Sequence, residues 1–149
     1  MKLIAVLFVG CALAVSACSG EDSGGTLPTA PSANVPFSAT DLRAGTGAEA
    51  TTGRTVAVNY SGWLYNAGGT DNKGTLFDSS LAAGRTPLQF SVGASNIIPG
   101  FSQCVQGMRV SGVRRCVIPP SLAYGSQGSG NTIPANATLI FELELLAVQ

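Results

Sequence analysis

Four segments of this chain alternate apolar and polar side chains with the two-residue period of a β-strand. They read TVAVNYSGWLY at 55–65, LQFSV at 88–92, VRRCVI at 113–118 and TLIFELELLAV at 138–148. In the last segment, Phe141, Leu143 and Leu145 fall opposite Glu142 and Glu144. Alternation of this kind predicts strands of an antiparallel sheet, with one face covered by the core and the other facing water.

A fifth segment, PGFSQCVQGM at 99–108, has the period of a helix instead. Apolar residues at i, i+3, i+4 and i+7 form one stripe along it, namely Phe101, Cys104, Val105 and Met108. Pro99 suits the first helical position, where its missing N–H would have no partner. The amides near Ile97 and Ile98 could hold a peptide carbonyl in apolar surroundings, although both residues could equally be ordinary core. Strands and helix together predict an α+β fold.

The composition excludes several classes of function. Apolar residues make up 45% of the 149 residues, which is enough for a globular core. Eight Lys and Arg balance eight Asp and Glu, so no basic surface for nucleic acid is expected. Histidine is absent, which excludes Ser-His-Asp catalysis and His-ligated metal sites. We expect no cofactor, no metal ion and no nucleic-acid partner.

The N-terminal region is typical of an exported protein. Residues 1–17 are predicted to be a signal peptide, with Lys2 before an apolar run and small residues before Cys18. The string VSAC at 15–18 resembles a bacterial lipobox, which predicts lipidation of Cys18; plain cleavage after Ala17 is the alternative. Residues 18–36, rich in Gly, Ser, Thr and Pro, are predicted to be a flexible linker to a domain at 37–149. We therefore expect a membrane-anchored lipoprotein of the bacterial cell envelope, facing the periplasm.

Two of the four cysteines remain once Cys11 leaves with the signal peptide and Cys18 carries lipid. Cys104 lies on the helix stripe and Cys116 lies on the core side of the strand at 113–118. An even pair in an oxidising compartment predicts a Cys104–Cys116 disulfide, with two buried thiols as the alternative.

Five strings in order resemble an FKBP-type peptidyl-prolyl cis-trans isomerase. They are AVNYSGWLY at 57–65, GTLFDSS at 74–80, NIIPGF at 96–101, GMRVSGVRRCVIPPSLAYG at 107–125 and IPANATLIFELELL at 133–146. The resemblance extends over residues 38–149 and implies an antiparallel, strongly bent β-sheet wrapped around one short α-helix. This expectation agrees with the strand and helix patterns.

The resemblance also implies a proline-binding pocket between helix and sheet. Catalytic roles would fall on Tyr60, Phe77, Asp78, Ile98, Tyr124 and Phe141, and substrate-binding roles on Ile97, Phe101 and Ile133. The Ile98 N–H and the Tyr124 hydroxyl would bind substrate carbonyls, and Phe101 would form the floor in place of the family's usual Trp. Asp78 either polarises the surroundings of the rotating carbonyl or braces the pocket, and bracing is favoured. Arg85 is the nearest candidate for a pocket arginine.

The implied chemistry suits a chain without histidine. Rotation about an X-Pro bond faces a barrier of about 18–20 kcal/mol, and lowering it requires no nucleophile. The implied function is peptidyl-prolyl isomerisation that assists unfolded or nascent exported proteins, with rapamycin-type macrolides as inhibitors. The alternative is a membrane-tethered, non-catalytic module that binds proline-containing segments.

Overall fold

A computed structural model describes residues 35–149 of the chain. The predicted signal peptide at 1–17, Cys18 and nearly all of the predicted linker lie outside the described residues. Within residues 35–149, no helix is long and apolar enough to cross a membrane.

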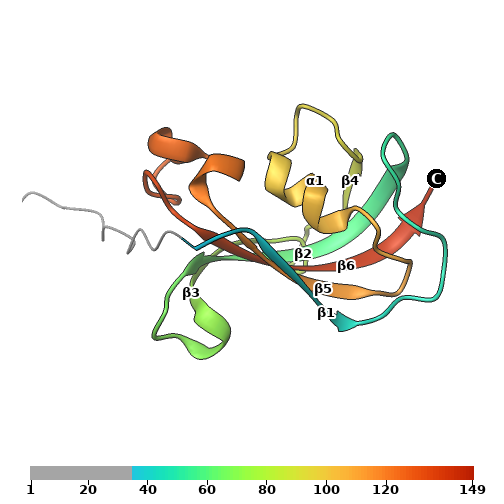
Figure 1. The fold of residues 1–149 in the computed structure, drawn as a ribbon, viewed down its shortest axis with the longest axis horizontal. Helices are drawn as coiled ribbons and strands as arrows, with labels where there is room; N and C mark the ends of the chain where they lie inside the picture. Colours follow the sequence, from blue (N-terminus) through green and yellow to red (C-terminus); the bar gives the residue numbers. More distant parts are fainter. Residues whose placement is uncertain (1–34) are drawn as a thin grey trace, which may run out of the picture.

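In the described part of the chain, six antiparallel strands form one sheet, and one α-helix crosses a face of it (Figure 1). The strands are β1 (Ser38–Arg43), β2 (Thr55–Tyr65), β3 (Lys73–Ser79), β4 (Leu88–Ser91), β5 (Val113–Ile118) and β6 (Leu139–Val148). Their order is β1-β5-β6-β2-β3, and β4 pairs with the first part of β2. The helix is α1 (Pro99–Val105), and three short 3₁₀ turns are η1 (Thr70–Asn72), η2 (Pro120–Leu122) and η3 (Gly125–Gln127). The predicted fold class is confirmed.

The core lies between α1 and the sheet, as the alternating patterns predict. On β6, Phe141, Leu143 and Leu145 are buried, whereas Glu142 and Glu144 are half-buried on the other face. The predicted inner faces of the other strands also pack into this core, through Val56, Val58, Phe90, Cys116 and Ile118. Burial of these faces against the helix supplies most of the driving force for the fold.

Close contact between α1 and β5 depends on a glycine and a disulfide. A Cβ at Gly100 would lie 2.3 Å from Cγ2 of Ile118, so a larger residue would push the helix off the strand. The sulfurs of Cys104 and Cys116 are joined, with their Cα atoms 6.0 Å apart. This is the pairing that the cysteine positions predict. Because α1 has only seven residues, such long-range contacts rather than helix propensity hold it in place.

The helix is shorter than its apolar stripe predicts. It ends at Val105, because Gln106 is extended (ψ 130°) and Gly107 has a φ of 76°, a left-handed conformation that favours glycine. Arg114 donates hydrogen bonds to the carbonyls of Cys104 (3.1 Å) and Gln106 (3.0 Å), which would otherwise lack partners at the helix end. Met108 is still buried, so the stripe identified core residues correctly and the helix boundary wrongly.

Two strands carry no clear pattern in the sequence. Every residue of β1 is exposed, since this edge strand pairs through its backbone with β5 and has no buried face. The other is β3, which begins at Lys73 directly after η1. Asp71 in η1 forms an ion pair with Arg115 of β5 (2.9 Å), which ties this turn to the outer face of the sheet.

Candidate active site

A cavity of about 190 Å³ opens between α1 and the sheet. Its lining consists of Tyr60, Phe77, Asp78, Leu88, Asn96, Ile97, Ile98, Phe101, Tyr124 and Phe141. The structure thus brings together eight of the nine residues for which the sequence predicted catalytic or substrate-binding roles. The ninth, Ile133, is 7% exposed and packs in the hydrophobic core outside this lining.

Aromatic rings form the floor and walls of the cavity. Phe101 projects from α1 and is only 3% exposed. Its ring centroid lies 5.2 Å from that of Phe141 and 5.8 Å from that of Tyr60, both edge-to-face. Phe77 from β3 packs edge-to-face on Phe141 at 5.6 Å. Such edge-to-face contacts hold the rings in fixed orientations and keep water away from the floor.

Gly62 of β2 makes room for two of these rings. A Cβ at this position would lie 2.7 Å from ring carbons of both Phe141 and Phe77. Carbon atoms in contact normally stay about 3.5–4.0 Å apart, so no side chain fits there while the two rings keep their places. A glycine in mid-strand is explained here by the close approach of the cavity walls.

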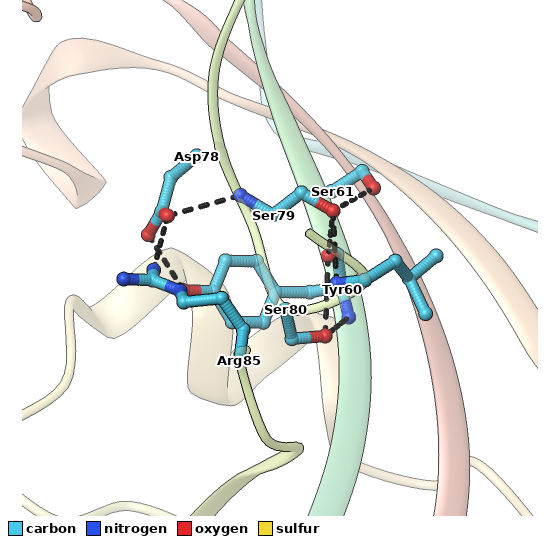
Figure 2. A network of polar contacts seen from close by, with 7 residues as sticks. Tyr60, Ser61, Asp78, Ser79, Ser80 and Arg85 are labelled. Carbon is cyan, nitrogen blue, oxygen red and sulfur yellow. Dashed lines mark hydrogen bonds and ion pairs between the residues drawn. The ribbon is translucent and has the colours of Figure 1, made fainter. Parts of the chain in front are cut away.

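The polar side of the cavity centres on Asp78 (Figure 2). Its Oδ2 accepts a hydrogen bond from the Tyr60 hydroxyl at 2.6 Å, and its Oδ1 accepts one from the Ser79 N–H at 2.9 Å. Arg85 forms an ion pair with the same carboxylate. Three donors therefore occupy Asp78, an arrangement that favours bracing over direct contact with substrate.

Tyr60 is held as a neutral phenol. Burial raises its pKa, and so do the hydrogen bond to Asp78 and the charge of that carboxylate, while Arg85 opposes the shift in part. At neutral pH the Tyr60 hydroxyl therefore keeps its proton and donates a hydrogen bond to Asp78.

Two serines fix the backbone of Tyr60 at the gap between β3 and β4. Tyr60 lies on β2 between the segments that pair with these two strands, so its amide has no ladder partner on that side, and its carbonyl accepts one backbone hydrogen bond, from the Ser80 N–H at 3.0 Å. The Tyr60 N–H donates to Ser80 Oγ at 2.9 Å, and Ser79 Oγ donates to the Tyr60 carbonyl at 3.1 Å (Figure 2). Hydrogen bonds at both the N–H and the carbonyl of Tyr60 thus fix the backbone that carries the phenol.

Two hydrogen-bond donors at the cavity have no partner within residues 35–149. The Ile98 carbonyl begins α1 by accepting from the Phe101 N–H at 3.0 Å, but the Ile98 N–H donates to no group there. The Tyr124 hydroxyl likewise forms no hydrogen bond within the described part of the chain, and this side chain is 38% exposed. Burial and the negative charge of Asp78 both raise the pKa of Tyr124, so the hydroxyl stays protonated. Both donors are available to carbonyl groups of a bound peptide.

Sequence reasoning missed some contributors and identified others incompletely. Ser80 and Gly62 were not expected to shape the site, although Ser80 belongs to the FDSS string and an isolated glycine in a strand indicates close backbone approach. Leu88 and Asn96 line the cavity as well. Arg85, the nearest candidate for a pocket arginine, pairs with Asp78.

The geometry suits binding and reshaping of an amide rather than covalent chemistry. The cavity is walled by aromatic rings, and two donors stand free at its edge. The carboxylate that lines it, Asp78, is already engaged by three donors. An apolar wall with fixed donors can bind a peptide group and favour a less polar state of it without forming a bond to it.

Known proteins resemble this chain in sequence and in fold. Residues 47–146 match the sequence profile described as FKBP-type peptidyl-prolyl cis-trans isomerase. An FK506-binding protein of Neisseria meningitidis serogroup A is 44% identical over 108 residues, covering 72% of this chain and 92% of that protein. The crystal structure of a peptidyl-prolyl cis-trans isomerase from Pseudomonas syringae aligns with a TM-score of 0.62 at 34% identity, covering 76% of this chain and 75% of that one. FkpA from Escherichia coli aligns with a TM-score of 0.63 at 37% identity, covering 76% and 48%.

Proposed function

This chain belongs to the FKBP-type peptidyl-prolyl cis-trans isomerase family, and from that membership we infer that the cavity between α1 and the sheet is where it turns over X-Pro bonds. The observation that carries this assignment is the pairing of an aromatic cavity with the free donors of Ile98 and Tyr124. A proline ring fits an aromatic cavity of this kind, while the two donors can hold the peptide groups beside it.

The aromatic walls lower the barrier by favouring the twisted amide. A planar amide is stabilised by resonance that separates charge between oxygen and nitrogen, and rotation removes this charge separation. A cavity that excludes water disfavours the polar planar state relative to the less polar twisted state. Phe101, Phe141, Phe77 and Tyr60 supply that environment.

The donors orient the substrate so that rotation occurs about one bond. The Ile98 N–H and the Tyr124 hydroxyl each bind a carbonyl of the substrate, which restricts the flanking peptide groups. Asp78 acts as a brace, because its hydrogen bond from the Tyr60 hydroxyl keeps that ring against the cavity. No proton is transferred in this scheme.

The assignment is tested by a protease-coupled isomerisation assay on a proline tetrapeptide. Removal of the Phe141 ring admits water to the cavity, so we expect Phe141→Ala to lower kcat/KM more than tenfold. Tyr124→Phe removes one hydrogen bond of about 0.5–1.5 kcal/mol, which corresponds to roughly a twofold to tenfold loss. Stability must be measured in parallel, because removal of a buried aromatic ring also costs about 3–5 kcal/mol of folding free energy. Peptide binding without any rate enhancement in the folded wild-type protein would contradict the assignment and favour the non-catalytic module.

We extend the proposal to ligands of the same cavity. Several relatives carry the name FK506-binding protein, and the eight predicted site residues that line this cavity support binding of FK506- or rapamycin-type macrolides here. Such a compound should inhibit the tetrapeptide reaction competitively. Inhibition that additional substrate does not relieve would contradict a shared site.

We further propose that the enzyme acts in the bacterial cell envelope as a lipoprotein. The support is the sequence: a signal-like segment at 1–17, the lipobox ending at Cys18, and a Gly/Ser/Pro-rich stretch before the domain. From this tether it would assist folding of exported proteins that contain proline. Labelling of expressing cells with a fatty-acid analogue should mark the wild type and not Cys18→Ala, which should leave the membrane fraction. An unlabelled wild type released after cleavage at Ala17 would favour plain secretion.

A further inference from the structure

A second hollow lies on the other side of Ile97 from the cavity. Its volume is about 430 Å³, against about 190 Å³ for the cavity between Tyr60 and Tyr124. Ile97 lines both hollows, and Ala94, Ser95 and Pro99 continue the wall of the second one. A chain leaving the cavity across Ile97 therefore enters this hollow directly.

No charged residue lines the second hollow. Val92, 3% exposed, contributes apolar surface, and the 8%-exposed Ser102 accepts a hydrogen bond from the Gly93 N–H at 3.3 Å. Ser95 and Gln103 line it as exposed residues, and their side chains form no hydrogen bond within residues 35–149. An uncharged side chain can bind here and pair with these polar groups, whereas a charged one would lose hydration without gaining an opposite charge.

At Tyr60 and Leu88 the cavity borders another hollow, and this end differs in charge from the end at Ile97. A hollow of about 320 Å³ shares Tyr60 and Leu88 with the cavity and is lined by Arg85 and the segment around it. Arg85 is paired with Asp78, so this end carries an ion pair while the end beyond Ile97 carries no charge. The two sides of a bound proline therefore meet different chemistry.

We propose that the hollow beyond Ile97 is a second substrate subsite, which binds uncharged residues of the polypeptide a few positions from the proline. This inference rests on the proposed function, since it assumes that the proline occupies the cavity. An extended chain advances about 3.3 Å per residue, so a segment of a few residues suffices to cross Ile97 and reach Gln103. The enzyme would thus prefer prolines flanked on one side by small or uncharged polar residues in an unfolded chain.

The test compares one proline core peptide with versions extended by three residues on its N- or C-terminal side. The added residues are all Ser, all Glu or all Lys, and turnover is followed by NMR exchange, which needs no protease. In the wild type, the serine extension on one of the two sides should raise kcat/KM at least about threefold over the core peptide. Glu and Lys extensions on that side should raise it less.

A charge placed at position 103 should make the subsite distinguish between the two charged extensions. At low ionic strength, Gln103→Lys should raise kcat/KM for the Glu-extended peptide about threefold to fivefold relative to the Lys-extended one, and Gln103→Glu should do the opposite. Added salt should weaken both effects. The matched control is Thr40→Lys, because Thr40 is exposed on β1 and lines neither the cavity nor the hollow beyond Ile97. In each of the four proteins, kcat/KM of an extended peptide is expressed relative to that of the core peptide in the same protein.

The outcomes separate this subsite from the proposed function. If the core peptide is turned over and no extension on either side changes kcat/KM, the subsite is overturned while the isomerase assignment stands. Equal shifts from Gln103→Lys and Thr40→Lys would also overturn it, because the effect would then come from net charge. A wild type that does not turn over the core peptide would overturn the proposed function and the subsite with it.

Discussion

Replacement of Gly62 by alanine should damage stability and catalysis together. The added methyl group would lie 2.7 Å from ring carbons of Phe141 and Phe77, about 1 Å closer than ordinary carbon contacts. Phe141 is 4% exposed and packs against Phe101 at 5.2 Å, so it has little room to move. Phe77 is half-buried on β3 at the sheet edge and should be displaced instead. The variant therefore loses one wall of the cavity in its proper place.

The expected cost follows from the overlap. Overpacking a well-filled core typically costs about 1–3 kcal/mol, so the urea midpoint should fall without a change in slope. Displacement of the Phe77 ring should also lower kcat/KM on a proline tetrapeptide. An increase of about 1.4 kcal/mol in the activation free energy corresponds to a tenfold loss.

The matched control for this change is Gly68→Ala in the loop after β2. A Cβ at Gly68 would have only an ordinary contact, 3.6 Å from the side-chain oxygen of Asn66, so both stability and activity should stay near those of the wild type. If Gly62→Ala is as stable and as active as this control, the explanation of Gly62 is wrong. If it is destabilised but fully active, the position of Phe77 is unimportant for catalysis.

Two further predictions concern the outer face of the sheet and the disulfide. Burial alone would raise the pKa of Glu142, but hydrogen bonds from Lys73 and Arg115, together with their charges, hold its pKa below the ordinary value. This contribution to stability is present above the unfolded pKa of about 4.3 and is lost as the pH falls through the pKa of the folded state. Urea unfolding at about pH 6 and about pH 3 should therefore show a smaller loss of unfolding free energy for Glu142→Gln than for the wild type. The Cys104–Cys116 bond closes a loop of 12 residues in sequence separation and should contribute roughly 3 kcal/mol, so dithiothreitol should lower the urea midpoint of the wild type. The same reagent should leave the double serine variant unchanged; an equal response of both proteins would argue against the bond.

Local sequence patterns predicted the fold class because each reports a repeat with a known physical cause. Alternation at 138–148 places every second side chain on one face, and burial follows that face from Phe141 to Leu145 on β6. The stripe beginning at Phe101 identified α1. Strand β1 escaped prediction because none of its residues is buried, so hydrophobicity carries no signal there. The predicted end of α1 was wrong by three residues, because Met108 is buried although it lies in the loop after the helix.

The sequence by itself determined which residues are apolar, which side chains can donate hydrogen bonds, and which strings resemble those of a known family. Only the tertiary structure decided how residues that are far apart in the chain, from Tyr60 to Phe141, line one small cavity together. It paired Arg85 with Asp78, placed Ile133 in the core and required Gly62 beneath two rings. These outcomes depend on strand register and on contacts between distant segments, which no local period encodes. The physical reason is that a repeat specifies which face a side chain takes, whereas its neighbours across that face are set by the packing of the whole domain.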